Sequence, residues 1–319
     1  MTTSSPIAPE LLALDWGTSS LRAFLMQDGQ ILDTRQSAHG IQHLPAPGAA
    51  GYRQAFAELV GDWIAQWPQL PVVASGMVGS AQGWREAPYV RCPADIGDLA
   101  SQSVRVDSGI GPEILIAPGV LFDQADALPD VMRGEEIQIA GALLSNPAWR
   151  QRACMLLPGT HSKWAQIEQG RIVRFTSYLT GELFSVLCRH SILGRLMPDP
   201  AVPTNDPEAF ALGLDTAARS GPGDLPHQIF GTRTLGLAGR LPPAALADYL
   251  SGLLIGHELV SGLAIAASEG PLVMIGAPAL CRRYADALTR LGRPVDAMLD
   301  NTAPAGLWHL AGAAGLIGG

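Results

Sequence analysis

The sequence predicts an α/β protein of two domains, in which helices cover a mixed β-sheet. Its 319 residues suffice for two domains, or for one large domain, with a substantial core. Short apolar strands alternate with segments of helical spacing. A strand, a Gly/Thr/Ser turn and a second strand occur once in each half of the chain, which is a repeat of topology and not of sequence.

The first half opens with two apolar runs around the first Gly/Thr/Ser turn, a pattern that predicts a hairpin of buried strands. A long helix is expected to stop before a proline, and a long irregular segment has the length of a functional or mobile loop. In order, we expect strands at 11–16, 21–26 and 31–35, helix 52–67, strand 71–74, loop 75–93, strand 113–117, and a helix that opens at 133–136.

The second half repeats the opening theme and then becomes more helical. A Pro-rich segment reads as a surface loop, and the last helix is built from small residues. In order, we expect strand 154–157, turn 158–164, strands 165–168 and 171–178, helix 181–190, loop 196–207, helix 243–268, strand 271–275, helix 280–291, edge strand 295–299 and helix 304–317.

Composition excludes several classes of function. The formal net charge is −8, which makes the chain a poor candidate for binding nucleic acid or an anionic membrane. The four cysteines are far apart and form no CxxC motif, so we expect reduced, buried thiols in a cytoplasmic protein. The first nine residues do not have the pattern of a signal peptide. The most apolar long segment, 244–267, contains Asp248, His257 and Glu258, which predicts a buried helix and not a membrane span.

The first turn carries groups suited to binding phosphate. Gly17, Thr18, Ser19 and Ser20 follow directly after Asp15 and Trp16. Hydroxyls and exposed backbone N–H groups donate hydrogen bonds to phosphate oxygens without adding bulk. Asp15 could hold Mg²⁺, usually through water, because this hard cation keeps much of its hydration shell. The alternative is an ordinary Ser/Thr-rich hairpin in which Asp15 stabilises the turn.

A second turn and a late glycine complete three ordered features. The chain has no Walker A motif, because Ser162 precedes its only lysine, and no strand is followed by GxGxxG. At Gly276 and Ala277 a strand ends in a position where adenine could lie close to the backbone. The remaining candidates for nucleotide binding lie in the second turn and are Gly159, Thr160, His161, Ser162 and Lys163.

These three features resemble the phosphate-1, phosphate-2 and adenosine motifs of the actin, hexokinase and Hsp70 superfamily. More narrowly, the chain resembles the 2-dehydro-3-deoxygalactonokinase family (2-keto-3-deoxygalactonate kinase). The stretches that carry this resemblance cover nearly the whole chain. They are 15–22, 76–80, 83–84, 87–89, 131–136, 158–164, 180–183, 250–256 and 276–277.

The resemblance implies a two-domain actin-like ATPase fold, which is ribonuclease H-like, with an interdomain cleft. Domain 1–150 would hold phosphate-1 and the sugar-acid side, and domain 151–319 would hold phosphate-2 and adenosine, with the last helix packing back on the first domain. The implied reaction is ATP-dependent phosphorylation of 2-dehydro-3-deoxy-D-galactonate at its terminal 6-hydroxyl, with Mg²⁺, in galactonate catabolism.

The resemblance also places the catalytic carboxylate. Related sugar kinases carry a Gly-Asp-Gln element at the start of the helix before phosphate-2, and Gly134, Glu135 and Glu136 occupy that place here. Glu135 is by position the base that orients or deprotonates the attacking hydroxyl, with Glu136 as the second candidate. The change from Asp to Glu is a departure from the pattern and alters the reach of the side chain. The first turn of a helix favours acidic residues, so a helix cap is the alternative role.

The substrate side is expected along the irregular loop and at nearby arginines. Lys163 could face the transferring phosphoryl group or the substrate carboxylate. A guanidinium binds a carboxylate through two hydrogen bonds, so three arginines compete for that role. The substrate candidates are Arg22, Met77, Trp84, Tyr89, Arg91 and Arg133.

Two other functions remain open from the sequence. One is a kinase for another sugar or sugar acid, such as 2-keto-3-deoxygluconate. The other is a non-catalytic ATP-dependent switch protein of the same superfamily, which would need no sugar site and usually carries large insertions that this chain lacks. The expected partner is a small sugar acid, with no nucleic acid and no membrane, and a homodimer is among the oligomeric states left open.

Overall fold

The computed structural model describes residues 8–198, 205–265 and 270–318. The start of the chain, part of the expected loop 196–207 and the end of the expected helix 243–268 lie outside the described residues. Contacts divide the chain into two compact units. The first comprises Met1–Ala153, Gln166–Phe175 and Asn301–Gly319, and the second comprises Cys154–Ala165 and Thr176–Asp300.

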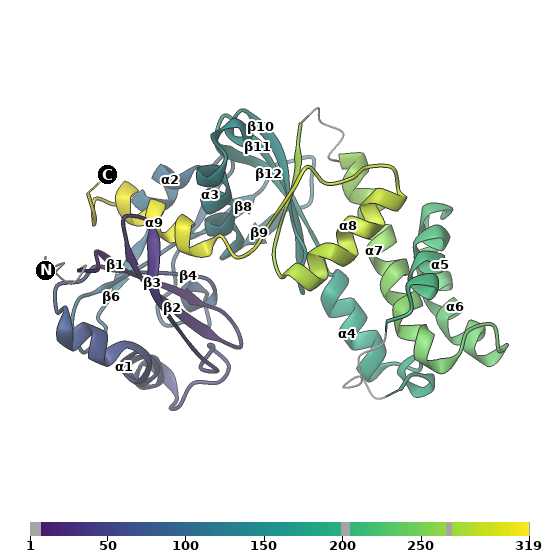
Figure 1. Cartoon of the computed structure of the whole chain (residues 1–319), viewed down its shortest axis with the longest axis horizontal. Helices are drawn as coiled ribbons and strands as arrows, with labels where there is room; N and C mark the ends of the chain where they lie inside the picture. The colour runs from purple at the N-terminus through teal and green to yellow at the C-terminus, as the bar shows by residue number, and fades with distance from the viewer. Residues whose placement is uncertain (1–7, 199–204, 266–269, 319) are drawn as a thin grey trace, which may run out of the picture. The chain divides into compact units, whose positions relative to one another are not determined.

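The order of strands and helices follows the sequence prediction in most places (Figure 1). The strands are β1 Leu11–Trp16, β2 Leu21–Gln27, β3 Gln30–Ser37, β4 Val72–Ser75, β5 Tyr89–Arg91, β6 Val104–Val106, β7 Ile114–Ile116, β8 Gly119–Phe122, β9 Asp130–Met132, β10 Arg152–Leu157, β11 Ser162–Glu168, β12 Arg171–Tyr178, β13 Leu272–Ile275 and β14 Ala297–Leu299. The α-helices are α1 Gly48–Gln66, α2 Ile96–Ser101, α3 Glu135–Ser145, α4 Thr180–His190, α5 Pro207–Ala218, α6 Leu225–Leu237, α7 Leu246–Ile265, α8 Pro278–Arg290 and α9 Ala303–Ala313.

A six-stranded mixed sheet forms the centre of the first unit, in the order β3-β2-β1-β4-β7-β6. β1 pairs with β2 antiparallel and with β4 parallel, so the expected mixed sheet is confirmed. Leu12, Leu14 and Trp16 of β1 are fully buried and share one core with Phe56 and Trp63 of α1. The central strand β1 therefore places its carboxyl end, and the turn that follows, on a rigid support.

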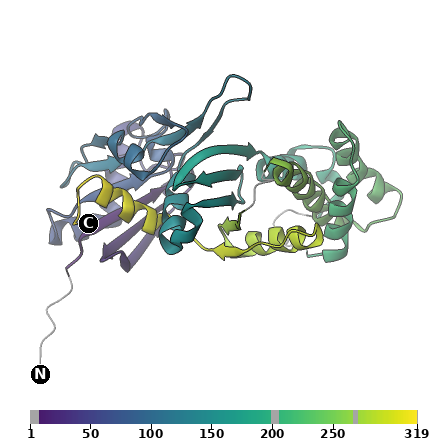
Figure 2. The same cartoon turned by 90° about the horizontal axis from the view of Figure 1, so that it is seen from above.

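The last helix, α9, belongs to the first unit, where it packs on α3, α2 and β1 (Figures 1 and 2). Leu307 and Leu310 of α9 are fully buried. The approach to α3 is close, because a Cβ atom on Gly306 would lie 1.9 Å from the carbonyl oxygen of Ile137. Only glycine permits this distance. Helix α9 therefore packs closely on α3, the helix that begins at Glu135, and supports it.

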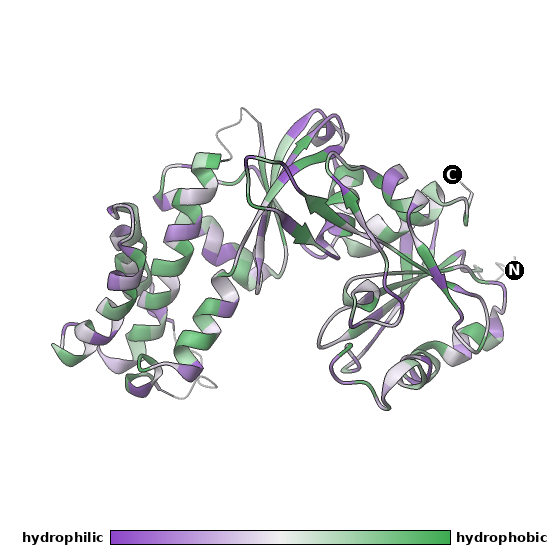
Figure 3. Cartoon of the chain, turned by 180° about the vertical axis from the view of Figure 1, so that it is seen from behind, coloured by the Kyte–Doolittle hydropathy of each residue, from purple (hydrophilic) through white to green (hydrophobic). Residues whose placement is uncertain are grey.

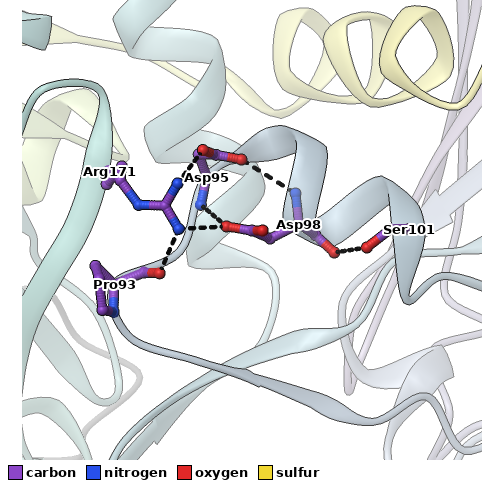
Figure 4. A network of polar contacts seen from close by, with 5 residues as sticks. All are labelled: Pro93, Asp95, Asp98, Ser101 and Arg171. Carbon is purple, nitrogen blue, oxygen red and sulfur yellow. Dashed lines mark hydrogen bonds and ion pairs between the residues drawn. The ribbon is translucent and has the colours of Figure 1, made fainter.

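An arginine on β12 fastens α2 within the first unit (Figure 4). Arg171 pairs with the carboxylates of Asp95 and Asp98 at 2.5 and 2.6 Å, and it donates to the carbonyl oxygen of Pro93 at 2.7 Å. Asp95 and Asp98 also form a capping box at the start of α2. One guanidinium therefore satisfies three acceptors on a segment that has little core of its own.

A second sheet repeats the arrangement, with the order β12-β11-β10-β13-β14. β10 has the next strand of the chain on one side and the parallel strand β13 on the other, as β1 has β2 and β4. This confirms the topological repeat, and β14 is the expected edge strand. Hydrophobic and hydrophilic residues alternate along the helices of the second unit (Figure 3). No helix among the described residues is long and apolar enough to cross a membrane.

Several elements were not predicted. The segment expected as one irregular loop contains β5 and a 3-10 turn at Met77–Gly79, and α2, β6, β8 and β9 are short additions. Helices α5 and α6 lie in a region for which no element was predicted beyond the loop that was expected to end at 207. The cysteines are all free, but only Cys154 and Cys281 are buried, so the prediction of four buried thiols was wrong for Cys92 and Cys188.

Candidate active site

The first turn presents its hydroxyls to solvent. β1 ends at Trp16 and β2 begins at Leu21, with Thr18 and Ser19 exposed between them. The N–H of Gly17 donates to the carbonyl oxygen of Ser20 at 2.9 Å, which closes the turn. The arrangement leaves two exposed hydroxyls beside backbone N–H groups, as a phosphate-binding turn requires.

A second loop supports this turn from outside. The backbone N–H groups of Ile41 and Gln42 donate to the carbonyl oxygens of Gly17 and Thr18, each at 3.1 Å. The indole N–H of Trp16 donates to the carbonyl oxygen of His39 at 2.9 Å. The turn carbonyls are thus engaged by the loop. No sequence pattern indicates this contact, because it depends on tertiary structure.

Asp15 lies at the carboxyl end of β1, where neighbouring strands bring charged and polar groups to it. Arg22 is its cross-strand partner, with Nη1 3.8 Å from the carboxylate, and Ser75 on β4 is its partner on the other side. Burial raises the pKa of Asp15, the charge of Arg22 lowers it, and the charge of Glu135 raises it further. The effect of Glu135 shows that its carboxylate lies within electrostatic reach of the Asp15 carboxylate.

Two glycines allow the strand ends and the start of α3 to meet. Gly76, after β4, has a φ of +93°, and Gly134, before α3, has a φ of +105°. A Cβ on Gly76 would lie 2.8 Å from the carbonyl oxygen of Trp16, and one on Gly134 would lie 3.4 Å from the Cα of Gly76. Both positions favour glycine for conformation, and Gly76 requires it for space as well. The carboxyl ends of β1 and β4 and the N-terminus of α3 therefore form one corner of the first unit.

The two neighbouring glutamates differ in environment. Glu136 is 1% exposed, and both its carboxylate oxygens accept from the N–H of Gly134, at 2.9 and 2.7 Å. Burial, together with the charge of Glu135, raises the pKa of Glu136 to about 8. Glu135 is half-buried and accepts from the N–H of Arg133 at 3.0 Å. Of the two, Glu135 is the carboxylate that a substrate can approach.

The pKa of Glu136 leads to a prediction about stability. The folded protein holds a proton on Glu136 that the unfolded chain releases at a pKa near 4.5, so this group makes stability fall as the pH rises from about 4.5 to 8. Glu136→Gln removes that dependence. We therefore expect Glu136→Gln to gain stability relative to the original protein as the pH is raised from 5 to 8, measured by urea unfolding. A parallel pH dependence in both proteins would contradict the buried, protonated state.

Arg133 is the most confined of the three candidate arginines. Its Nη2 donates to the carbonyl oxygen of Ala87 at 2.8 Å, and its guanidinium lies 4.4 Å from the centroid of the Tyr89 ring. Nε and Nη1 are buried and have no hydrogen-bond partner among the described residues. A buried N–H group without an acceptor destabilises the folded protein, and a carboxylate that accepted its hydrogen bond would remove this free-energy cost.

Three other predicted substrate residues lie in different surroundings. Trp84 stacks on Tyr52, with ring centroids 5.5 Å apart, and meets Trp16 edge-on, so it packs against the core. Met77 begins the 3-10 turn after β4. Arg91 pairs with Asp123 at 2.6 Å on an exposed surface. The structure brings Arg22 near Asp15 and Arg133 near Tyr89. The guanidinium of Arg91 instead forms its ion pair with Asp123.

The second turn resembles the first in exposing its tip. Thr160 and His161 are exposed between β10 and β11. The N–H of Glu182, in the first turn of α4, donates to the carbonyl oxygen of Thr160 at 3.0 Å. The imidazole Nε2 of His161 lies 2.5 Å from the carboxylate of Glu182. Helix α4 therefore holds the turn in place, and Glu182 orients His161.

Ser162 and Lys163 lie deeper than the turn. Lys163 is 4% exposed, and its Nζ donates to the carbonyl oxygen of His161 at 3.0 Å. The Ser162 hydroxyl is fully buried, 3.1 Å from the hydroxyl of Tyr284. Tyr284 in turn donates to Glu258 at 2.7 Å, and Trp164 donates to the same carboxylate at 3.0 Å. A buried polar network thus joins β11 to α7 and α8.

The late glycine lies beside the second turn. β13 runs parallel to β10, so their carboxyl ends are adjacent. A Cβ on Gly276 would lie 3.5 Å from the carbonyl oxygen of Pro158, and α8 begins after Ala277. The structure therefore brings together, within one unit, the two segments predicted to bind phosphate and adenosine.

A cavity of about 430 Å³ lies beside the second turn in the second unit. It lies among α4, α7 and α8, with Gly159 at the second turn as one lining residue. Most of its surface is apolar, from residues such as Phe184, Ile255 and Leu280, and Arg283 and Asp248 add charge. A largely apolar pocket with a few polar groups is typical of a small-molecule site. No site role was predicted for Arg283, or for Glu182 within the stretch 180–183, because the role of each is recognised only by its partners in space.

The residues present fit a magnesium ion bound together with a nucleotide. Among the described residues, no cluster of three or more His, Cys, Asp or Glu side chains could hold a metal ion alone. Mg²⁺ in such sites is held by one or two carboxylates and by substrate phosphates. The carboxylate of Asp15, next to an exposed hydroxyl turn and within electrostatic reach of Glu135, matches that donor set.

A family model and several known proteins match most of this chain. The family model for 2-keto-3-deoxy-galactonokinase matches residues 15–310. The 2-dehydro-3-deoxygalactonokinase of Escherichia coli (strain K12) is 35% identical over 292 residues, 92% of this chain and 94% of that protein. A crystal structure of a candidate 2-dehydro-3-deoxygalactonokinase from Sinorhizobium meliloti has a TM-score of 0.84 at 30% identity, covering 95% of this chain and 98% of that one. Component A of an (R)-2-hydroxyglutaryl-CoA dehydratase from Acidaminococcus fermentans shares the fold alone, with a TM-score of 0.52 at 14% identity, covering 95% of this chain and 98% of that one.

Proposed function

The chain belongs to the 2-keto-3-deoxy-galactonokinase family and is a carbohydrate kinase of actin-like fold, and from that premise we propose that it transfers the terminal phosphoryl group of ATP to the 6-hydroxyl of 2-dehydro-3-deoxy-D-galactonate. The observation that carries this proposal is the corner of the first unit, where Asp15 lies 3.8 Å from Arg22 and within electrostatic reach of Glu135. A switch protein would need the phosphate turns but not a base beside them.

Phosphoryl transfer depends mostly on positioning and electrostatics. In our proposal Glu135 accepts the proton of the 6-hydroxyl as the oxygen attacks phosphorus. In the first unit the hydroxyls of Thr18 and Ser19 hold phosphate oxygens, and the bond from the Gly17 N–H to the Ser20 carbonyl closes that turn. In the second unit the side chains of Thr160 and His161 are the proposed phosphate contacts. When bound, Mg²⁺ would neutralise phosphate charge, held by Asp15.

The sugar acid must also be held by its carboxylate. Arg133 is the best candidate to bind the substrate carboxylate. Its buried Nε and Nη1 have no hydrogen-bond acceptor among the described residues, and the ring of Tyr89 stacks on its guanidinium and orients it. Arg22 is committed in part to Asp15. Lys163 remains a prediction as a partner of the phosphoryl group or the substrate. So does our assignment of residues 1–150 to the sugar-acid side and 151–319 to the nucleotide side.

An ATP-consumption screen tests the function. We expect Mg²⁺-dependent release of ADP only when a 2-keto-3-deoxy sugar acid is present, with the galacto acid turned over faster than the gluco acid. Plain hexoses and aldonates serve as controls, because they lack the keto-deoxy acid group. Equal ADP release with and without every acid would indicate an ATPase switch, and preference for another acid would change the substrate but not the reaction class.

A further inference from the structure

An arginine in the wall of the cavity is held rigidly by contacts at two edges and one face. The Nη2 of Arg283, on α8, donates to Asp248 at 2.7 Å, and its Nε donates to the hydroxyl of Ser251 at 3.1 Å. The guanidinium carbon lies 4.1 Å from the centroid of the Phe210 ring. A group with these partners loses little freedom when it binds a ligand, because it is already oriented.

The anchor of this arginine is itself fixed. The side chain of Asp248, on α7, is 3% exposed, and its second oxygen accepts from the backbone N–H of Asp206 at 3.0 Å. Asp248 therefore has a partner for each oxygen. Its position is set by α7 and by the start of α5, so the plane of Arg283 is set by the same two elements.

Phe210 covers one face of the Arg283 guanidinium, and Arg283 also lines the cavity. Phe210 lies against the covered face and is not among the residues that line the cavity, whereas Arg283, Asp248 and Ser251 are. Apolar residues, Leu280 among them, form other parts of the wall. The cavity thus offers a flat cation among apolar side chains, and it begins at the second turn, where phosphate is expected.

We propose that Arg283 stacks on the base of the bound nucleotide and selects purines over pyrimidines, an inference that rests on the proposed use of ATP. A guanidinium stacks on aromatic faces, and the attraction is larger when the pair is withdrawn from water. A two-ring purine covers more of the guanidinium and of the apolar wall than a single-ring pyrimidine does. Asp248 and Ser251 act as positioning residues for Arg283.

The test compares nucleotides in three variants. In Arg283→Met we expect the KM for ATP to rise by roughly 5- to 30-fold, the factor that corresponds to about 1–2 kcal/mol of lost stacking. The kcat should change less than about 2-fold, because the contact is the same in the ground state and the transition state. The KM for UTP should change little, so the preference for ATP over UTP falls. Arg282→Met is the matched control, since Arg282 is the exposed neighbour on the same helix.

Arg283→Met also leaves the buried Asp248 without its ion pair and could unfold the protein. Arg283→Lys keeps a positive charge for Asp248 but lacks the planar group, so a folded Arg283→Lys protein should still show a raised KM for ATP. A folded Lys variant with an unchanged KM, or an equal rise in KM for ATP and UTP, would overturn the proposal. So would an original protein that binds UDP as tightly as ADP in calorimetry.

Calorimetry with ADP and UDP also separates this inference from the proposed reaction. If no sugar acid supports ADP release, the proposed function fails. The effect of Arg283→Lys on the ADP-to-UDP affinity ratio then still decides the role of Arg283.

Discussion

Glu135→Gln is expected to lower kcat by on the order of 10²–10⁴, as the loss of a positioned general base does. The substitution keeps the size of the side chain and an oxygen that can accept from the N–H of Arg133, so the start of α3 should stay intact. The KM for ATP should change little, because the proposed nucleotide contacts lie in the two turns. Steady-state kinetics with the best sugar acid of the screen measures both constants.

Glu136→Gln is the internal control for this result. Glu136 is buried and already accepts twice from Gly134, so its replacement should leave most of the turnover. A large loss of kcat in Glu136→Gln with near-normal Glu135→Gln would transfer the role of base to Glu136. A large loss of ATP affinity in Glu135→Gln would instead indicate a magnesium ligand.

Glu258→Ala is expected to reduce the free energy of unfolding by about 2–5 kcal/mol, because each buried donor left without an acceptor costs about 1–3 kcal/mol. The carboxylate is 2% exposed and accepts from Trp164 and Tyr284. Burial raises its pKa, and hydrogen bonds from Thr180, Tyr284 and others oppose that shift. Urea unfolding measures the loss.

The matched control for Glu258 is Glu168→Ala. Glu168 pairs with Arg152 at 3.2 Å, but both side chains are about half exposed, so the loss should stay below about 1 kcal/mol. Glu258→Gln keeps one acceptor and should lie between the two. If Glu258→Ala unfolds at the same urea concentration as the original protein, the buried network does not hold β11 to α7 and α8.

The strands that surround the two turns were predictable because each is a short apolar run bounded by turn residues. Elements of three residues, such as β8 and β9, are too short to show a period in the sequence. Helix α6 was also beyond prediction, since Thr232 is its only fully buried residue among those the structure describes, and a helix with so little buried surface has no apolar stripe to detect. The capping box of Asp95 and Asp98 was a readable signal for α2.

The residues of the candidate site also divide into those that the sequence predicts and those that it does not. Motif residues close in sequence, such as Asp15 with its turn, could be grouped from the sequence alone. The pairing of Arg91 with Asp123, the packing of Trp84 on Tyr52 and the burial of Ser162 depend on segments far apart in the chain. No local sequence pattern encodes such contacts. The sequence could therefore suggest these residues as candidates for the site but could not predict their partners or their burial.

The position of α9 has a consequence for how the protein is made. The first unit cannot be complete until Ala303–Ala313 has left the ribosome, because Leu307 and Leu310 fill its interior. During synthesis, the apolar surfaces of α3 and β1 that contact α9 stay uncovered until the whole second unit has been translated. A nascent chain of the first half is therefore a candidate client for chaperones. An expression fragment that ends near residue 150 should aggregate, because it lacks both α9 and residues 166–175 of the same unit, whereas the full chain should stay in solution.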